Sequence, residues 1–315
     1  MSTSRFANGA FLLRSPNKTA EKDFRSRVFG NYIPFLLSPL NDSRRSLRRY
    51  QCGLLGCLLL WNTATATETV TRENSRLVEQ HALVEGAATQ GLALAEDAYY
   101  GATEKSICRF DTDWNFLQEK SIRVEGVNHL GAIDYHDGYL WGGFLNHGLT
   151  DGKYDRRLNR AIIAKIRAKD LEIIKTWDIT ADVKWIDPVC FDGRYLWVGD
   201  MSDLGIHRYK LVHGELIRDG IFRYPQAMSF SQGIRIVGNK LYTIHTFGTM
   251  DGLFEFDIPE HLSDTINRPK RVWKIQETKS HLEGFDFIPG QPRQIWHAQG
   301  KQVDRYELET VPPPP

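Results

Sequence analysis

The 315-residue sequence has few cysteines, almost no net charge and no long hydrophobic run. Its four cysteines show no Cys-x-x-Cys or Cys/His spacing, which argues against a zinc site and against a disulfide-dependent fold. Cys108 and Cys190 fall within expected strands, so we expect them to be buried thiols. The formal charge is +1, and beyond residues 1–50 the chain carries 30 Lys/Arg and 36 Asp/Glu. That mildly acidic balance argues against nucleic acid as a partner, because phosphate binding needs a basic surface.

The strong catalytic signatures are also missing. The sequence has no Gly-rich phosphate loop, no Gly-x-Ser-x-Gly and no His-Glu-x-x-His. Its hydrophobic content of 41% and mean hydropathy of −0.40 are typical of a soluble globular protein with material for a core. Function must therefore be inferred from the organisation of the chain.

An uncharged apolar run, Cys52–Trp61, spans ten residues, about half the length that crosses a bilayer. Four arginines precede it within residues 44–49, and the small residues of 64–66 follow it. This order is typical of a cleaved signal peptide, and the alternative is a buried helix of the domain. We therefore expect a protein exported to an extracytoplasmic or extracellular location, with no membrane attachment after cleavage. The expected divisions are a basic extension at 1–50, the signal-peptide core and cleavage region at 51–66, a folded domain at 67–309 and a Pro-rich tail at 310–315.

Five segments of the sequence repeat one pattern: a polar or small residue, alternating apolar positions, a tight polar turn and an aromatic-rich strand. They start at Gln90, Gly131, Asp187, Gln232 and Glu283, with separations of 41, 56, 45 and 51 residues. This spacing suits units of four short antiparallel strands, the size of a propeller blade. An ordinary β-sandwich, the alternative, does not require five equivalent hairpins. The sequence therefore predicts an all-β, five-bladed β-propeller.

The fifth repeat lacks one strand. After its first hairpin only 302–308 can form a strand before the terminal run of prolines. Residues 77–84 precede the first repeat and have no other expected partner. We predict that this N-terminal segment supplies the outer strand of the last blade, which closes the ring and removes an exposed edge.

Polar residues recur where the innermost strand of each blade starts and where the second strand ends. Both places lie at one end of the propeller axis, which we call the mouth. The five start positions are given above, and the end positions are Thr103, Phe144, Asp200, His245 and Gln299. Convergent polar groups of this kind bind a small molecule, a peptide or an ion.

The residue types in the mouth predict roles. Carboxylate and amide oxygens suit Ca²⁺, for which the expected ligands are Asp187, Asp200 and Glu283, with Gln90 and Gln232 as amide ligands. For an organic ligand, the expected binding residues are Gln90, Gln232, Thr103 and Gln299. A histidine beside carboxylates can act as a general base, so the candidate catalytic groups are Glu283, His245 and His129. The alternative for all of them is hydrogen bonding to neighbouring blades and water, with His129 as a structural histidine.

Two further features have structural expectations. The charged insertion at 146–159 is predicted either to cover the mouth as a lid or to be a solvated loop. Aromatic residues occupy one equivalent strand position in four repeats, which predicts that they pack between blades. They are Trp141, Trp197, Tyr242 and Trp296.

Thr89-Gln90-Gly91-Leu92, followed by Tyr100-Gly101 and by 107–111, resembles the opening blade of the plant and bacterial type of glutaminyl-peptide cyclotransferase. The resemblance covers about 25 residues and implies a secreted five-bladed propeller that cyclises N-terminal glutamine. The chain departs from that family where Glu-Ser-Thr-Gly should follow the first hairpin, since it has Gly101-Ala102-Thr103-Glu104. Glu283-Gly284 resembles the metal-binding glutamate of gluconolactonase and regucalcin-like propellers, which normally have six blades.

Three classes of function remain at this point. The leading hypothesis is a monomeric propeller that binds a small molecule or a divalent cation in its mouth. An enzyme of the cyclotransferase or lactonase type is the second. A protein-interaction scaffold is the third. The enzyme requires carboxylates that converge in the mouth, whereas a scaffold requires no such convergence.

Overall fold

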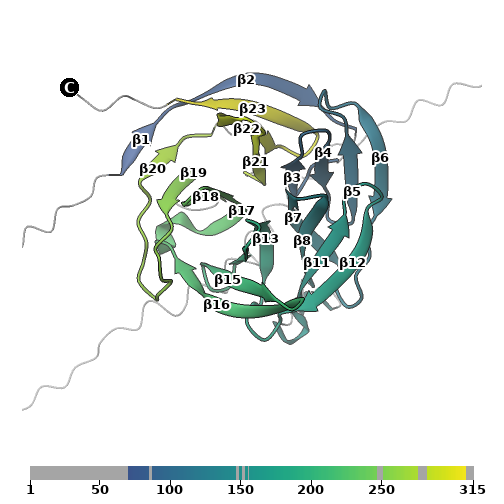
Figure 1. Cartoon of the computed structure of the whole chain (residues 1–315), viewed down its shortest axis with the longest axis vertical. Helices are drawn as coiled ribbons and strands as arrows, with labels where there is room; N and C mark the ends of the chain where they lie inside the picture. The colour runs from purple at the N-terminus through teal and green to yellow at the C-terminus, as the bar shows by residue number, and fades with distance from the viewer. Residues whose placement is uncertain are drawn as a thin grey trace, which may run out of the picture. The chain divides into compact units, whose positions relative to one another are not determined.

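The computed structural model describes residues 70–84, 87–146, 149–150, 153–154, 156–246, 251–275 and 282–309. Within them, five sheets of mainly antiparallel strands surround a central axis, with the inner strands β3, β7, β13, β17 and β21 closest to it (Figure 1). The predicted five-bladed β-propeller is therefore confirmed. The expected leader and the Pro-rich tail lie outside the described residues. No helix among the described residues is long and apolar enough to cross a membrane.

Each blade has four strands, and blades I to III follow the chain order. Blade I contains β3 (Gly91–Leu94), β4 (Tyr99–Ala102), β5 (Ser106–Phe110) and β6 (Phe116–Ser121). Blade II contains β7 (His129–His136), β8 (Tyr139–Leu145), β11 (Ala161–Arg167) and β12 (Glu172–Asp178). Blade III contains β13 (Ile186–Phe191), β14 (Tyr195–Asp200), β15 (Gly205–Val212) and β16 (Glu215–Arg223).

The last two blades take in the N-terminal segment. Blade IV contains β17 (Phe230–Val237), β18 (Lys240–Thr246), β19 (Gly252–Asp257) and β20 (Arg271–Trp273), and blade V contains β21 (Phe285–Ile288), β22 (Gln291–Ala298) and β23 (Gln302–Leu308). β2 (Ser75–Ala82) pairs antiparallel with β23 and completes blade V, as predicted. β1 (Thr71–Glu73) pairs parallel with β20, which the sequence did not predict. The N-terminal segment thus joins two blades (Figure 1).

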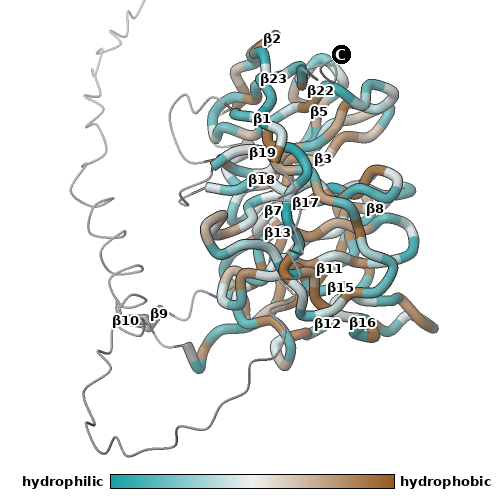
Figure 2. The backbone as a smooth tube through the Cα atoms, turned by 90° about the vertical axis from the view of Figure 1, so that its left-hand side faces the viewer, coloured by the Kyte–Doolittle hydropathy of each residue, from teal (hydrophilic) through white to brown (hydrophobic). Residues whose placement is uncertain are grey.

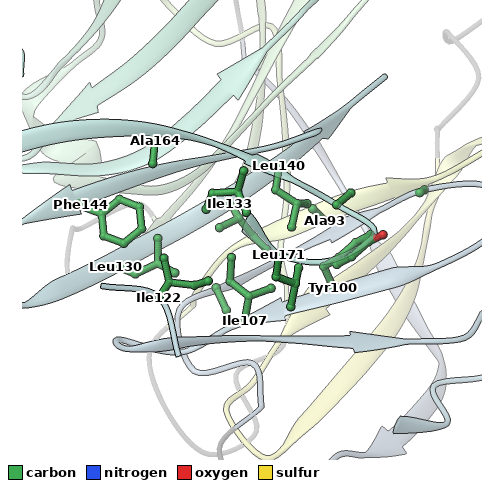
Figure 3. Close-up of a cluster of buried hydrophobic side chains, with 14 of the residues drawn as sticks. Ala93, Tyr100, Ile107, Ile122, Leu130, Ile133, Leu140, Phe144, Ala164 and Leu171 are labelled. Carbon is green, nitrogen blue, oxygen red and sulfur yellow. The ribbon is translucent and has the colours of Figure 1, made fainter. Parts of the chain in front are cut away.

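The hydrophobic core is divided into five layers, one between each pair of adjacent blades. Hydrophobic and hydrophilic segments follow one another along the blades in Figure 2. Inner strands such as β3 are buried on both faces because they lie between layers, whereas outer strands such as β6 are partly exposed. Figure 3 shows the layer between blades I and II, where Ile107 of blade I lies near Leu130 of blade II, and Tyr100 of blade I lies near Leu140 and Leu171 of blade II. The four aromatic residues of the repeat lie in or against the other four layers, which confirms their predicted packing between blades. Cys108 and Cys190 are buried free thiols, as expected.

The insertion of blade II is partly described. β9 (Leu149–Thr150) and β10 (Lys153–Tyr154) form a two-stranded hairpin, followed by the 3-10 turn η1 (Arg156–Leu158). Its role as a lid stays a prediction.

Candidate functional site

The inner strands of blades II, III and IV each begin with a β-bulge at the mouth. In blade III, Asp187 and Pro188 both lie opposite Gly199. Proline has no N–H to give to the ladder and is tolerated inside a sheet at such irregularities. A bulge also re-aims side chains. Asp187 is directed at blade II, where its Oδ1 accepts the Ala132 N–H at 3.3 Å.

The bulge of blade IV places an extra residue, Gln232, at the start of β17, between Ser231 and Gly233. Gln232 is buried, and among the described residues its Oε1 has no hydrogen-bond partner. A buried acceptor without a donor costs about 1–3 kcal/mol. Gln232 therefore combines a position at the mouth with an unused acceptor.

Blades V and I meet closely at the axis. The Gly284 N–H donates to the Gln90 carbonyl oxygen at 3.3 Å, and a Cβ on Gly284 would lie 2.7 Å from the Gly91 Cα. Only glycine allows the two backbones to approach this closely. Glu283, the residue before, is buried, and its N–H donates to Nε2 of His297 at 3.2 Å. Burial lowers the pKa of His297 to about 3, so its ring is the neutral acceptor that this hydrogen bond requires.

His129 joins blades I and II at the mouth. Its Nε2–H donates to Gln90 Oε1 at 2.9 Å, and its Nδ1 lies 3.9 Å from Glu104 Oε1. The His129 side chain is 11% exposed, whereas that of Glu104 is 56% exposed. The structure thus brings together an amide, an imidazole and a carboxylate from two blades, at a place that solvent reaches.

The end positions of the second strands have structural partners. Thr103 Oγ1 accepts the Ser106 N–H at 2.9 Å and tightens the turn between β4 and β5. Asp200 accepts hydrogen bonds from the backbone N–H groups of the loops beside it and from a serine hydroxyl, with partners Lys184, Trp185 and Ser202. The Gln299 N–H donates to the Gln302 carbonyl in the turn between β22 and β23.

His245 lies out of reach of solvent. It is 0% exposed, and its Nε2 is 2.8 Å from Thr243 Oγ1. Burial lowers its pKa to about 3. A group that is buried and neutral at physiological pH lacks the access that a general base needs, so among the candidate histidines the geometry favours His129 for contact with a ligand.

The described residues contain no group of three or more His, Cys, Asp and Glu side chains that could hold a metal ion. Of the three expected carboxylate ligands of calcium, Asp187 lies at the start of β13 and Glu283 lies two residues before β21, whereas Asp200 binds loop backbone. Calcium binding stays a prediction.

Sequence reasoning missed two contributors, Glu104 and His297. Glu104 could have been predicted from its position directly after Thr103, on the turn that reaches the mouth. His297 was visible only as part of an apolar strand, because its contact with Glu283 depends on the register of β21 and β22.

A five-bladed propeller with polar side chains at the starts of its inner strands is the class of protein that these observations define. The glutaminyl cyclase of Myxococcus xanthus has this fold, with a TM-score of 0.58 and 10% identity over 78% of this chain and 100% of that chain. Two further solved structures have lower TM-scores. A putative gluconolactonase has a TM-score of 0.45, with 16% identity over 73% of this chain and 92% of that chain. The PQQ-bound aldose sugar dehydrogenase of Streptomyces coelicolor has a TM-score of 0.44, with 12% identity over 75% of this chain and 98% of that chain. No protein-family model and no curated protein sequence matches the chain.

The sequence departs from the cyclotransferase pattern at Gly101, and the structure leaves no room for a side chain at this position. A Cβ on Gly101 would lie 2.2 Å from the Ala87 carbonyl oxygen and 3.2 Å from the Ala88 Cβ. The backbone of 87–88 thus occupies the space that a side chain at 101 needs. A glutamate side chain at this position would therefore require that segment to move.

Proposed function

We propose that this protein is a propeller that binds a small polar molecule in its mouth. The observation that carries the proposal is the contact between His129 and Gln90, 2.9 Å long, which links two blades at a place that solvent reaches. Neither side chain is needed for the backbone hydrogen bonds that join the strands of its own blade. Polar groups held by rigid strands at the end of a propeller axis are well suited to orient a ligand.

The polar groups indicate the chemistry of the ligand. Gln232 has a buried oxygen that lacks a donor, and Asp187 and Glu283 add carboxyl groups at neighbouring strand starts. A ligand with N–H or O–H donors matches these acceptors, because supplying a donor removes the cost of the unused oxygen. We therefore infer a donor-rich molecule, such as an amine, an amide or a polyol.

Catalysis of the glutaminyl cyclotransferase type is the second candidate. The fold shared with the Myxococcus xanthus enzyme and the Thr89-Gln90-Gly91 segment favour it. Gly101 counts against it, because the carboxylate expected there is missing and the space is filled. His129 with Glu104 is the remaining acid–base pair. Because Nε2 carries the hydrogen that Gln90 Oε1 accepts, the ring nitrogen that can take a proton is Nδ1, which lies 3.9 Å from Glu104 Oε1.

The export of the protein is part of the same proposal and rests on the arginines, the apolar run and the small residues of 44–66. A monomer in an extracytoplasmic compartment then meets its ligand directly. The mature N-terminus is expected near Thr67.

The test is a calorimetric titration of the full chain with a glutaminyl dipeptide and, separately, with Ca²⁺. Binding of the dipeptide with release of ammonia supports the enzyme, and binding without turnover supports the ligand-binding propeller. His129→Ala is expected to weaken binding by about 2–10-fold, because it removes a hydrogen bond at the site. His261→Ala, at an exposed histidine between β19 and β20, is the matched control.

If His129→Ala and the control bind alike, the mouth assignment is wrong. Heat from Ca²⁺ that is lost in Asp187→Asn and in Glu283→Gln supports the metal site. The absence of such heat removes calcium from the proposal and leaves an organic ligand.

A further inference from the structure

Three of the five inner strands carry a charged residue at one equivalent position of the repeat, three residues after each start. These positions hold Ala93, Asp134, Cys190, Arg235 and Asp286. Elsewhere in the inner strands the pattern is largely apolar. An arginine and two aspartates thus face one another across the axis because the five-fold pseudo-symmetry of the propeller places equivalent positions at the same height.

Arg235 lies at the centre of this group. Its Nε is 2.7 Å from Asp286 Oδ1 and 3.5 Å from Asp134 Oδ1. Its Nη2 donates to the carbonyl oxygens of Leu92 at 2.7 Å and Ile133 at 3.0 Å. One guanidinium therefore contacts blades I, II and V from its own place in blade IV.

The two carboxyl groups extend the network. Asp134 Oδ2 accepts the N–H of Phe191, in blade III, at 2.8 Å. Asp286 accepts the N–H groups of Leu94 and Phe287, each at 2.8 Å. With these contacts, the group reaches all five blades.

The charges of the group do not balance if both acids are ionised. Arg235, Asp134 and Asp286 are all buried, with exposures of 5%, 4% and 9%. The other titratable group that faces them is the Cys190 thiol, whose pKa is raised by burial and by Asp134, so it remains neutral. One cation beside two carboxylates leaves one buried negative charge, which is costly in a medium of low polarity.

We propose that Arg235, Asp134 and Asp286 form an axial clasp that holds one proton, carried by Asp134, and that loss of this proton weakens the ring of blades. With the proton in place the clasp is neutral.

Asp134 carries the proton because its carboxyl group is held less well than that of Asp286. It is farther from the guanidinium, by 3.5 Å against 2.7 Å, and it accepts one backbone N–H where Asp286 accepts two. Burial raises the pKa of Asp134 to about 7, Arg235 opposes that rise and Asp286 adds to it. The clasp therefore changes charge near neutral pH.

The effect on stability follows from the direction of this shift. An unfolded aspartate has a pKa of 3.8, so between about pH 4 and about pH 7 the folded protein holds a proton that the unfolded chain has lost. Stability from this group is highest at the acidic end of that range. It decreases as the pH rises through about 7 and then stays constant.

The test compares the melting temperature of the full-length protein with that of Asp134→Asn from pH 5 to pH 8. Asparagine resembles the protonated acid in shape and cannot ionise. The wild type is expected to lose stability relative to this variant as the pH rises, with the difference constant above the transition. Asp97→Asn, which makes the same change in the exposed turn between β3 and β4, is expected to follow the wild type at every pH.

Two outcomes overturn the proposal. One is a wild-type profile that stays parallel to that of Asp134→Asn. The other is that pH-difference infrared spectra of the wild type, recorded across neutrality, show no signal from a protonated carboxylic acid. The infrared measurement needs only the wild type, so it decides the question even if Asp134→Asn does not fold. A protonated carboxyl band that disappears as the pH rises is the expected result.

Discussion

Deletion of the N-terminal segment tests how the propeller ring is closed. Removing residues 70–84 takes away β1 and β2, which make three cross-strand pairs with β20 and seven with β23. At about 0.2–1 kcal/mol for each pair, the seven pairs of blade V alone contribute about 1.4–7 kcal/mol. A typical domain has about 5–15 kcal/mol of stability in total. The deletion is therefore expected to remove a large share of the stability of the whole ring.

The loss is not confined to strand pairing. The fully buried Asp304 loses the hydrogen bond that Gln80 Nε2 donates at 2.9 Å, and Arg305 loses its ion pair with Glu79 at 2.6 Å. β23 also becomes an exposed edge, which favours aggregation. A loss of about 4 kcal/mol lowers the melting temperature by about 8–16 °C in a domain of this size.

The assay is thermal unfolding followed by circular dichroism, at one protein concentration for both proteins. A peptide of residues 70–84 added in excess is expected to restore part of the lost stability, and a scrambled peptide is not. An unchanged melting temperature after the deletion refutes the reasoning, because it means that blade V does not depend on its fourth strand.

The remaining predictions concern single sites and the leader. Gly101→Ala is expected to lower stability by about 1–3 kcal/mol, since the new Cβ meets the Ala87 carbonyl oxygen, and an unchanged urea midpoint would contradict this close contact. Burial lowers the pKa values of His245 and His297 to about 3, so their contribution to stability is complete above pH 6.5 and is lost as the pH falls toward 3. The variant His245→Asn is expected to lose less stability in acid, as measured by pH-dependent unfolding. An acid profile identical to that of the wild type would contradict this prediction. N-terminal sequencing of the protein recovered from its host is expected to begin near Thr67, and recovery of a form that retains Cys52–Trp61 argues against a cleaved leader.

The repeat made the fold predictable from the sequence. Blades I to IV have a hairpin of the same length between their two inner strands, and the hairpin of blade V is longer. The shared pattern allowed the five start positions, from Gln90 to Glu283, to be aligned without a structure. The strand missing after Leu308 had one candidate partner, which gave the closure by β2. β1 escaped prediction because three residues carry too little periodicity, and its position depends on the path between two blades.

The site was less predictable, because it depends on contacts between blades. The start positions at Asp187 and Gln232 were found from the repeat, but the bulges that orient them are set by register, with Pro188 as the single visible signal. The full burial of His245 could not be foreseen, because it results from packing against Tyr224 and Phe254. The charged positions of the axial clasp were present in the aligned repeats and became meaningful once the strands met at the axis.

The most direct test of the proposed ligand site is a thermal-shift screen of donor-rich small molecules against the full chain. The same screen is run on the double variant Gln90→Leu/His129→Ala, and the two results are compared. A ligand present at 100 times its dissociation constant stabilises the folded protein by about 2.7 kcal/mol. The proposal predicts molecules that raise the melting temperature of the wild type and of His261→Ala and that fail to do so in the double variant. A ligand that stabilises the double variant as strongly as the wild type would contradict binding at the mouth.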